Sequence, residues 1–196
     1  MDANAQIWFM PVLSWVAVLV FAGIAIWRGA RPISRGFVID RLLRYSFLFP
    51  LGMLSLWGFI GHVFFPDRAA AVIGWSPSPF QYEVGVANLG LGLLSIYAAF
   101  SNFQARVATA IMAFCFLVGA GIGHIRDIVQ AGNLAPGNAG PIMVTDFLTP
   151  IVIVVLLVLT ARKPKSPATI ALEAELRVAR KALQDYRSAL DNFGRD

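Results

Sequence analysis

Five long apolar runs dominate the chain, and the short segments between them hold many of its polar residues. Each run is about 20 residues long, the length that an α-helix needs to cross the hydrocarbon core of a bilayer. In lipid such runs are expected to be helical, because a helix satisfies its own backbone hydrogen bonds. The pattern predicts transmembrane helices over residues 7–27, 42–65, 80–100, 105–125 and 141–160.

The first run is predicted to be a retained anchor and not a cleaved signal peptide. Residues 1–6 contain Asp2 and no basic residue, whereas a signal peptide begins with a basic segment. The run from Ile7 to Trp27 is also long enough to span the membrane by itself.

After residue 161 the apolar runs end and a different pattern begins. Ser166 and Pro167 are typical of a helix N-cap followed by proline at the first helical position. The residues after them predict a soluble helix over 166–194 whose apolar positions alternate spacings of four and three, as in a coiled coil. Pairing with a second copy or a partner, and packing beneath the membrane bundle, both remain open. The seam comprises Leu172, Leu176, Ala179, Leu183, Tyr186, Leu190 and Phe193.

Composition supports a membrane location. The 196 residues are 58% hydrophobic and only 14% charged, whereas soluble proteins average about 25% charged residues. We therefore expect an all-α integral membrane protein with a transmembrane domain over residues 1–161. Spans two to five are expected to form a four-helix core, and the C-terminal amphipathic helix to lie in the cytoplasm.

The net charge of +5 predicts topology, and we do not expect nucleic-acid binding. Most Arg and Lys residues outside the tail helix lie beside the apolar runs, on the side that the positive-inside rule assigns to the cytoplasm. The expected location is the bacterial inner membrane, with the N-terminus outside and the C-terminus cytoplasmic. The basic residues on the cytoplasmic side include Arg28, Arg31, Arg35, Arg41, Arg44, Arg106, Arg162, Lys163 and Lys165.

Polar residues gather near the ends of the spans that are predicted to face outward. Ionisable side chains inside a membrane are costly, so each is a candidate for function. The first candidates, for a metal or a small ligand, are His62, Glu83, His124 and Asp146. Supporting candidates are Asn88, Arg126 and Asp127.

Three interpretations of this polar layer stay open. Two imidazoles and two carboxylates suit a divalent metal such as zinc, iron or manganese. Alternatively the layer binds an organic ligand or carries protons, or it is an ion-paired end of the bundle in which Arg126 neutralises a carboxylate. Pro150 adds to the case for a site, because it has no N–H for the carbonyl of Asp146.

Two glycine-containing segments are expected to be structural. Gly119, Gly121 and Gly123 predict close packing of the fourth span against a neighbour. The loop 130–141 is rich in Gly, Asn and Pro, so its asparagines are expected to form turns more than to cover the polar layer.

The chain resembles an uncharacterised family of small bacterial multi-span membrane proteins. The resemblance covers roughly residues 40–160 and leaves out the first span and the tail. It implies a membrane location and assigns no activity. It depends on Gly74-Trp75-Ser76-Pro77-Ser78-Pro79, Gln81, Glu83, Ala87-Asn88, Gly123-His124, Arg126-Asp127, Asn133, Pro136-Gly137-Asn138-Ala139-Gly140-Pro141 and Asp146.

The sequence is therefore compatible with two functions. The first is a membrane protein with a polar ligand or metal site near its outer face. The second is an assembly subunit that uses residues 172–193 to recruit a partner or to self-associate. The sequence identifies the lipid bilayer as a partner in both cases, and it assigns no reaction.

Overall fold

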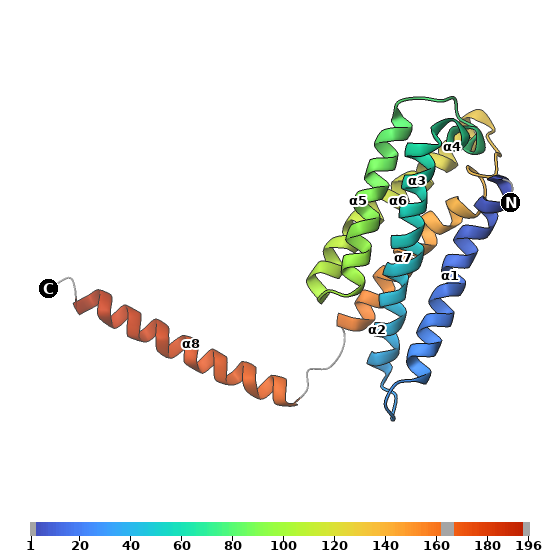
Figure 1. The fold of residues 1–196 in the computed structure, drawn as a ribbon. Coiled ribbons are helices and arrows are strands. Elements are labelled where there is room, and N and C mark those ends of the chain that lie inside the picture. The colour runs from blue at the N-terminus through green and yellow to red at the C-terminus, as the bar shows by residue number, and fades with distance from the viewer. Residues whose placement is uncertain (1–2, 162–166, 194–196) are drawn as a thin grey trace. The chain divides into compact units, whose positions relative to one another are not determined.

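The chain was analysed as a computed structural model, which describes residues 3–161 and 167–193. It forms two separate units, divided after Ala161 (Figure 1). The described residues are helical, with no strand among them. Five of their helices are long and apolar enough to cross a membrane, as the sequence predicts.

The first unit contains four single helices of membrane length or longer, one composite helix and one short helix. The single helices are α1 (Ala3–Trp27), α5 (Phe80–Ala99), α6 (Phe103–Ala131) and α7 (Pro141–Ala161). The composite second span consists of α2 (Arg35–Ser46), a π-helical segment η1 (Phe47–Met53) and α3 (Leu54–Phe64). The short helix is α4 (Pro66–Ile73).

The second span begins at Arg35 and not at residue 42, because the hydroxyl of Ser34 caps it by accepting the amide of Phe37 at 3.1 Å. This first turn is too polar to be recognised as part of a span. Pro50 lies inside η1. Proline removes one backbone donor, and the wider π-helical turn lets the helix continue past it.

The fourth span is also longer than predicted. Asn102 caps α6 by accepting the amide of Ala105 at 3.0 Å, and Gly132 ends it with a left-handed backbone (φ 65°). His124 and Asp127 consequently lie inside a continuous helix. A further helix, α4, occupies a segment expected to be loop; Pro66 at its start and Gly74 (φ 82°) after its end are the signals that define it.

The core draws on the second to fifth spans. Helix α3 packs along α5, and α6 packs along α7. Helix α1 lies outside this group against α2, η1 and α7, and the ring of Phe21 contacts Phe49 at 5.0 Å between centroids. The core cluster comprises Ile39, Leu43, Phe47, Leu51, Leu91, Ala98, Ala99, Ala110, Ala113, Ile153, Leu156 and Leu157.

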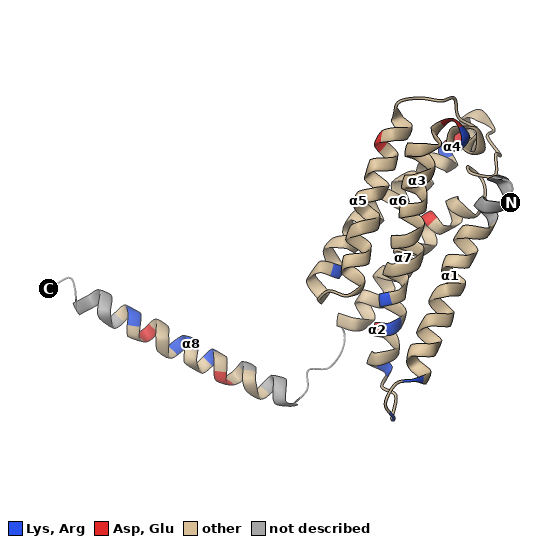
Figure 2. Cartoon of the chain, in the orientation of Figure 1, with Lys and Arg blue, Asp and Glu red and all other residues tan. Residues whose placement is uncertain are grey.

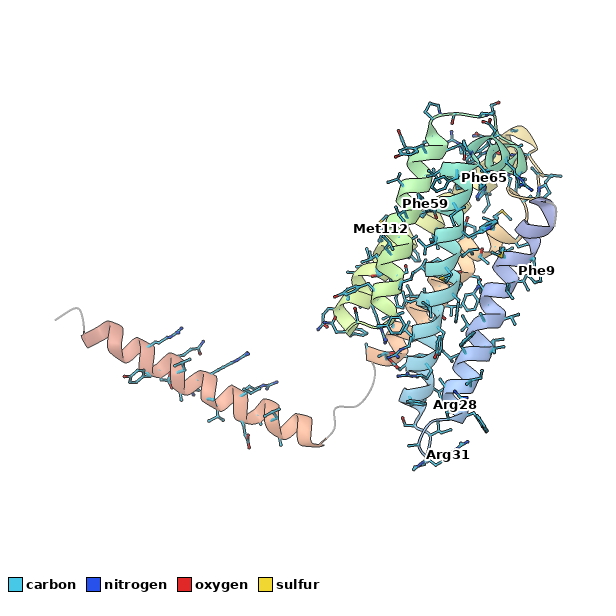
Figure 3. All side chains as sticks on the ribbon, viewed as in Figure 1. Phe9, Arg28, Arg31, Phe59, Phe65 and Met112 are labelled. Carbon is cyan, nitrogen blue, oxygen red and sulfur yellow. The ribbon has the colours of Figure 1, made fainter. Side chains whose placement is uncertain are left out.

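The two ends of the first unit differ in charge. Basic residues concentrate at the end where α1 connects to α2, which Arg28 and Arg31 mark in Figure 3 and the blue segments mark in Figure 2. Arg106 is buried there and binds Asp40 Oδ1 at 2.8 Å and the carbonyls of Ala98 and Ala99, both at 3.1 Å. This arginine therefore caps the last turn of α5. The opposite end, near α4, carries both signs.

The second unit is the single helix α8 (Pro167–Phe193). Its apolar seam includes Leu172, Leu176 and Leu183, which are between 50% and 57% exposed. Ser166, the predicted N-cap, lies outside the described residues.

Candidate functional site

A cavity of about 750 Å³ lies at the α4 end of the first unit. Residues of α3 and α5 form one side, residues of α6 and α7 form the other, and α4 contributes Arg68, Ala69, Val72 and Ile73. Phe65, which also lines it, marks this end of the bundle in Figure 3. The walls are mostly apolar, and each of the helices from α3 to α7 contributes at least one polar side chain. Such a mixture of apolar wall and few polar groups is typical of ligand pockets.

His124 is the most firmly held polar residue of the cavity. It is 7% exposed, and its Nδ1 lies 2.7 Å from Oδ1 of Asn138. Asn138 is fully buried and donates from Nδ2 to the carbonyl of Asn133 at 2.8 Å. The loop asparagine therefore does more than form a turn, because it orients an imidazole across the end of the cavity.

Asp146 approaches His124 from α7. Its Oδ2 lies 3.6 Å from His124 Nε2, which is longer than a hydrogen bond, and no donor reaches this oxygen within the described part of the chain. Asp146 is 7% exposed. One turn further along α7, the hydroxyl oxygen of Thr149 is buried and likewise lacks a partner in that part of the chain. Both residues line the cavity.

Trp75 supports His124 from the loop after α4. Its ring stacks on the imidazole with 6.1 Å between centroids, and its Nε1–H donates to Asp127 Oδ2 at 2.9 Å. Asn133 donates to the same carboxylate oxygen at 2.6 Å and to the carbonyl of Ile73 at 2.9 Å. Asp127 thus connects α6 to both loops and does not itself line the cavity.

His62 lines the cavity from α3 and repeats the arrangement of His124. Its Nδ1 lies 2.6 Å from Oε1 of Gln81, at the start of α5. Asn88 also lines the cavity, donates to the carbonyl of Val84 at 2.9 Å and lies against Gly58 of α3. Both histidines are therefore held at Nδ1 by amide side chains.

Two predicted residues lie elsewhere. Glu83 is exposed in the first turn of α5 and does not line the cavity. Arg126 is exposed and donates to Gln130 at 3.1 Å, so the expected ion pair with a carboxylate does not form in the described residues. The structure does not assemble the four predicted metal ligands: no group of three or more His, Cys, Asp or Glu that could hold a metal occurs in the described ranges.

The glycines of α6 divide into two roles. At Gly121 an added Cβ would lie 2.6 Å from the ring of Phe147, so this residue allows the close packing that the sequence predicts. At Gly119 and Gly123 an added Cβ would meet nothing within 4 Å, and both residues line the cavity. These two glycines therefore leave space open instead of bringing helices together.

Sequence reasoning missed several residues of the site. Gln81 entered only through the resemblance, and Asn138 was expected to form a turn. Trp75 entered only through the resemblance. No local pattern shows that these residues meet the histidines, because each contact joins segments that the chain path brings together.

Fold and cavity together define an all-helical protein with five helices of membrane length and a largely apolar cavity whose polar groups include His124 and Asp146. The chain belongs to a family of unknown function, DUF6790, which matches it over residues 8–166. This confirms the resemblance to an uncharacterised family and extends it to the first span. No curated protein and no solved structure matches the chain.

Proposed function

We propose that this protein binds a small organic molecule in the cavity at the α4 end. Apolar walls would hold the body of the ligand, and Asp146, His124 and Thr149 would contact its polar group. The proposal assigns binding and no reaction.

The unpartnered carboxyl oxygen of Asp146 carries the proposal. A buried polar atom without a hydrogen bond costs roughly 1–3 kcal/mol, and more if it is charged. Thr149 adds a second such atom one turn away. A polar group that costs stability inside a membrane helix, and that borders a cavity, is best explained by a ligand that satisfies it.

The same proposal includes an orientation. The basic end of the first unit would face the cytoplasm under the positive-inside rule, which puts the cavity in the outer half of a bacterial inner membrane. The N-terminus would then lie outside and α8 in the cytoplasm.

Binding of zinc, iron or manganese has less support. Structural metal sites in proteins use about four side-chain ligands, and catalytic ones about three. The described residues contain no group of three or more such ligands, and His124 and Asp146, 3.6 Å apart, supply two.

Filling the cavity tests the proposal. Gly119→Leu would place a side chain in open space inside the cavity, and Gly90→Leu is the matched control, because a Cβ there also meets nothing within 4 Å but Gly90 does not line the cavity. The probe is 2-(2-naphthyl)ethanol, measured by equilibrium dialysis against protein in lipid nanodiscs and against empty nanodiscs.

Wild type and Gly90→Leu should retain the probe above the empty-nanodisc level, and Gly119→Leu should lower its affinity about tenfold or more. A tenfold change corresponds to about 1.4 kcal/mol. Equal binding by Gly119→Leu and wild type, or no retention by any of the three proteins, would refute the proposal.

A second function, self-association, is favoured by α8. A single helix cannot cover its own apolar seam, and Leu172, Leu176, Leu183 and Tyr186 are at least half exposed. We infer that two copies pair through this seam. Chains anchored in one membrane present their tail helices in the same direction, so the pairing would be parallel. In that register Glu175 of one copy faces Arg180 of the other, an attractive pair.

Mass measurement in detergent tests the pairing. Leu176→Asp and Leu183→Asp together should convert a dimer to a monomer in light scattering coupled to size exclusion. Val178→Asp is the control, since Val178 is 71% exposed and lies off the seam. A monomeric wild-type protein would refute self-association through α8.

A further inference from the structure

The hydrogen bonds of Asn138 determine which atom His124 presents to Asp146. Nδ2 of Asn138 faces two carbonyls, that of Asn133 at 2.8 Å and that of His124 at 3.4 Å, so this end of the amide is the donor. Oδ1 is therefore an acceptor, and Nδ1 of His124 carries the hydrogen between them. In the neutral imidazole Nε2 then has a lone pair and no hydrogen.

The polar end of the cavity consequently presents acceptors. Nε2 of His124 and Oδ2 of Asp146 stand 3.6 Å apart, too far for a direct hydrogen bond. The unpartnered hydroxyl of Thr149 can accept as well. Thr145, also on this wall, already donates its hydroxyl hydrogen to the carbonyl of Ile142 at 2.9 Å, which leaves its oxygen free to accept.

Two of the neighbouring donors are already engaged. The indole N–H of Trp75 binds Asp127, and the amide of Asn88 binds Val84. Arg68 of α4 also lines the cavity, but no Lys or Arg nitrogen lies within 4 Å of Asp146 in the described residues. Nε2 of His124 and Oδ2 of Asp146 are therefore satisfied by a ligand that supplies hydrogens, and a positive charge would compensate the carboxylate.

We propose that the cavity binds a protonated amine attached to an apolar body, with its ammonium group between His124 and Asp146. The inference rests on the proposed function and names the ligand class of the same site. An ammonium group offers three donors, which matches the acceptors of His124, Asp146 and Thr149. The ring of Trp75, stacked on His124 and lining the cavity, adds an aromatic face of the kind that attracts cations.

The rest of the cavity suits an apolar body. Phe116, Leu117 and Ile142 line it beside the polar wall, and Pro50 and Leu54 line it deeper in the bundle. A volume of about 750 Å³ accommodates an aryl or alkyl group well beyond the amine itself.

A matched pair of probes separates the contribution of the amine group to affinity from that of the apolar body. 2-(2-Naphthyl)ethylamine and 2-(2-naphthyl)ethanol differ only in the terminal group, and each is dialysed against nanodiscs holding wild type, Asp146→Asn or Asp67→Asn. Asp67→Asn is the control for charge alone, because Asp67 is exposed on α4 and does not line the cavity. Empty nanodiscs correct for partition of the amine into lipid.

Wild type should bind the amine about tenfold or more tightly than the alcohol, and Asp146→Asn should abolish that preference while keeping alcohol affinity within about threefold. Asp67→Asn should behave as wild type. Thr149→Val is a second variant of the wall and should weaken the amine more than the alcohol. If Asp146→Asn fails to fold, the test uses the other two proteins. Wild type should prefer the amine to the alcohol, and Thr149→Val should reduce that preference.

The failures are distinguishable. If both probes bind in the cavity with equal affinity, the inference that the ligand is an amine is wrong, and the proposed function is unaffected. Binding of neither probe would overturn both. Purified wild type could instead contain stoichiometric zinc that the amine does not displace and that His124→Ala lacks. That result would identify His124 and Asp146 as metal ligands and refute the inference of an amine ligand.

Discussion

Arg106 makes three hydrogen bonds from a buried position, and replacing it tests whether they hold the basic end of the bundle together. Arg106→Met keeps an unbranched apolar stem in place of the arginine stem and removes every donor. Asp40 loses its bond of 2.8 Å but keeps Arg41 at 2.7 Å, and the carbonyl of Ala98 keeps the amide of Ser101 at 3.2 Å.

The carbonyl of Ala99 is the group left without a hydrogen-bond partner by this substitution. Among the described residues no donor other than Arg106 reaches it from outside its own helix. An orphaned buried acceptor costs about 1–3 kcal/mol, and the lost charged bond to Asp40, which is partly solvated, adds about 1–2 kcal/mol. We expect Arg106→Met to lower the free energy of unfolding by about 3 kcal/mol, and Arg106→Lys to lower it by less.

Unfolding by SDS in mixed micelles, followed by circular dichroism, measures this loss. Arg126→Met is the matched control, since Arg126 is exposed and binds only Gln130, so its loss should stay below about 0.5 kcal/mol. If Arg106→Met and Arg126→Met unfold at the same SDS fraction, the argument from buried hydrogen bonds is wrong.

Two further stability predictions use the same unfolding assay. Asn138→Ala should cost about 2 kcal/mol, because it leaves Nδ1 of His124 buried without an acceptor; an unchanged midpoint would show that the loop does not hold the histidine. Gly121→Ala should cost about 1–2 kcal/mol by displacing Phe147, whereas Gly90→Ala, at an open position, should be neutral or stabilising by up to about 1 kcal/mol. A stabilising Gly121→Ala would mean that α6 and α7 pack less closely than the structure shows.

The sequence alone determined the number of membrane-length helices. The length of an apolar run is a local property, and in lipid such a run must be helical to satisfy its backbone hydrogen bonds. The sequence also predicted that the histidines and several carboxylates lie near the helix ends opposite the basic loops. Helix bounds were less certain where polar residues extend a span, as at Arg35 and Ala131, since caps and first turns do not look apolar.

The tertiary structure decided which polar residues meet. Successive residues point about 100° apart around a helix, so the rotation of each helix in the bundle determines that Asp146 lines the cavity while Glu83 does not. That rotation depends on packing between helices, such as Phe147 on Gly121. The path of the loop after α6 brings Asn138 to His124, a contact that no local pattern encodes.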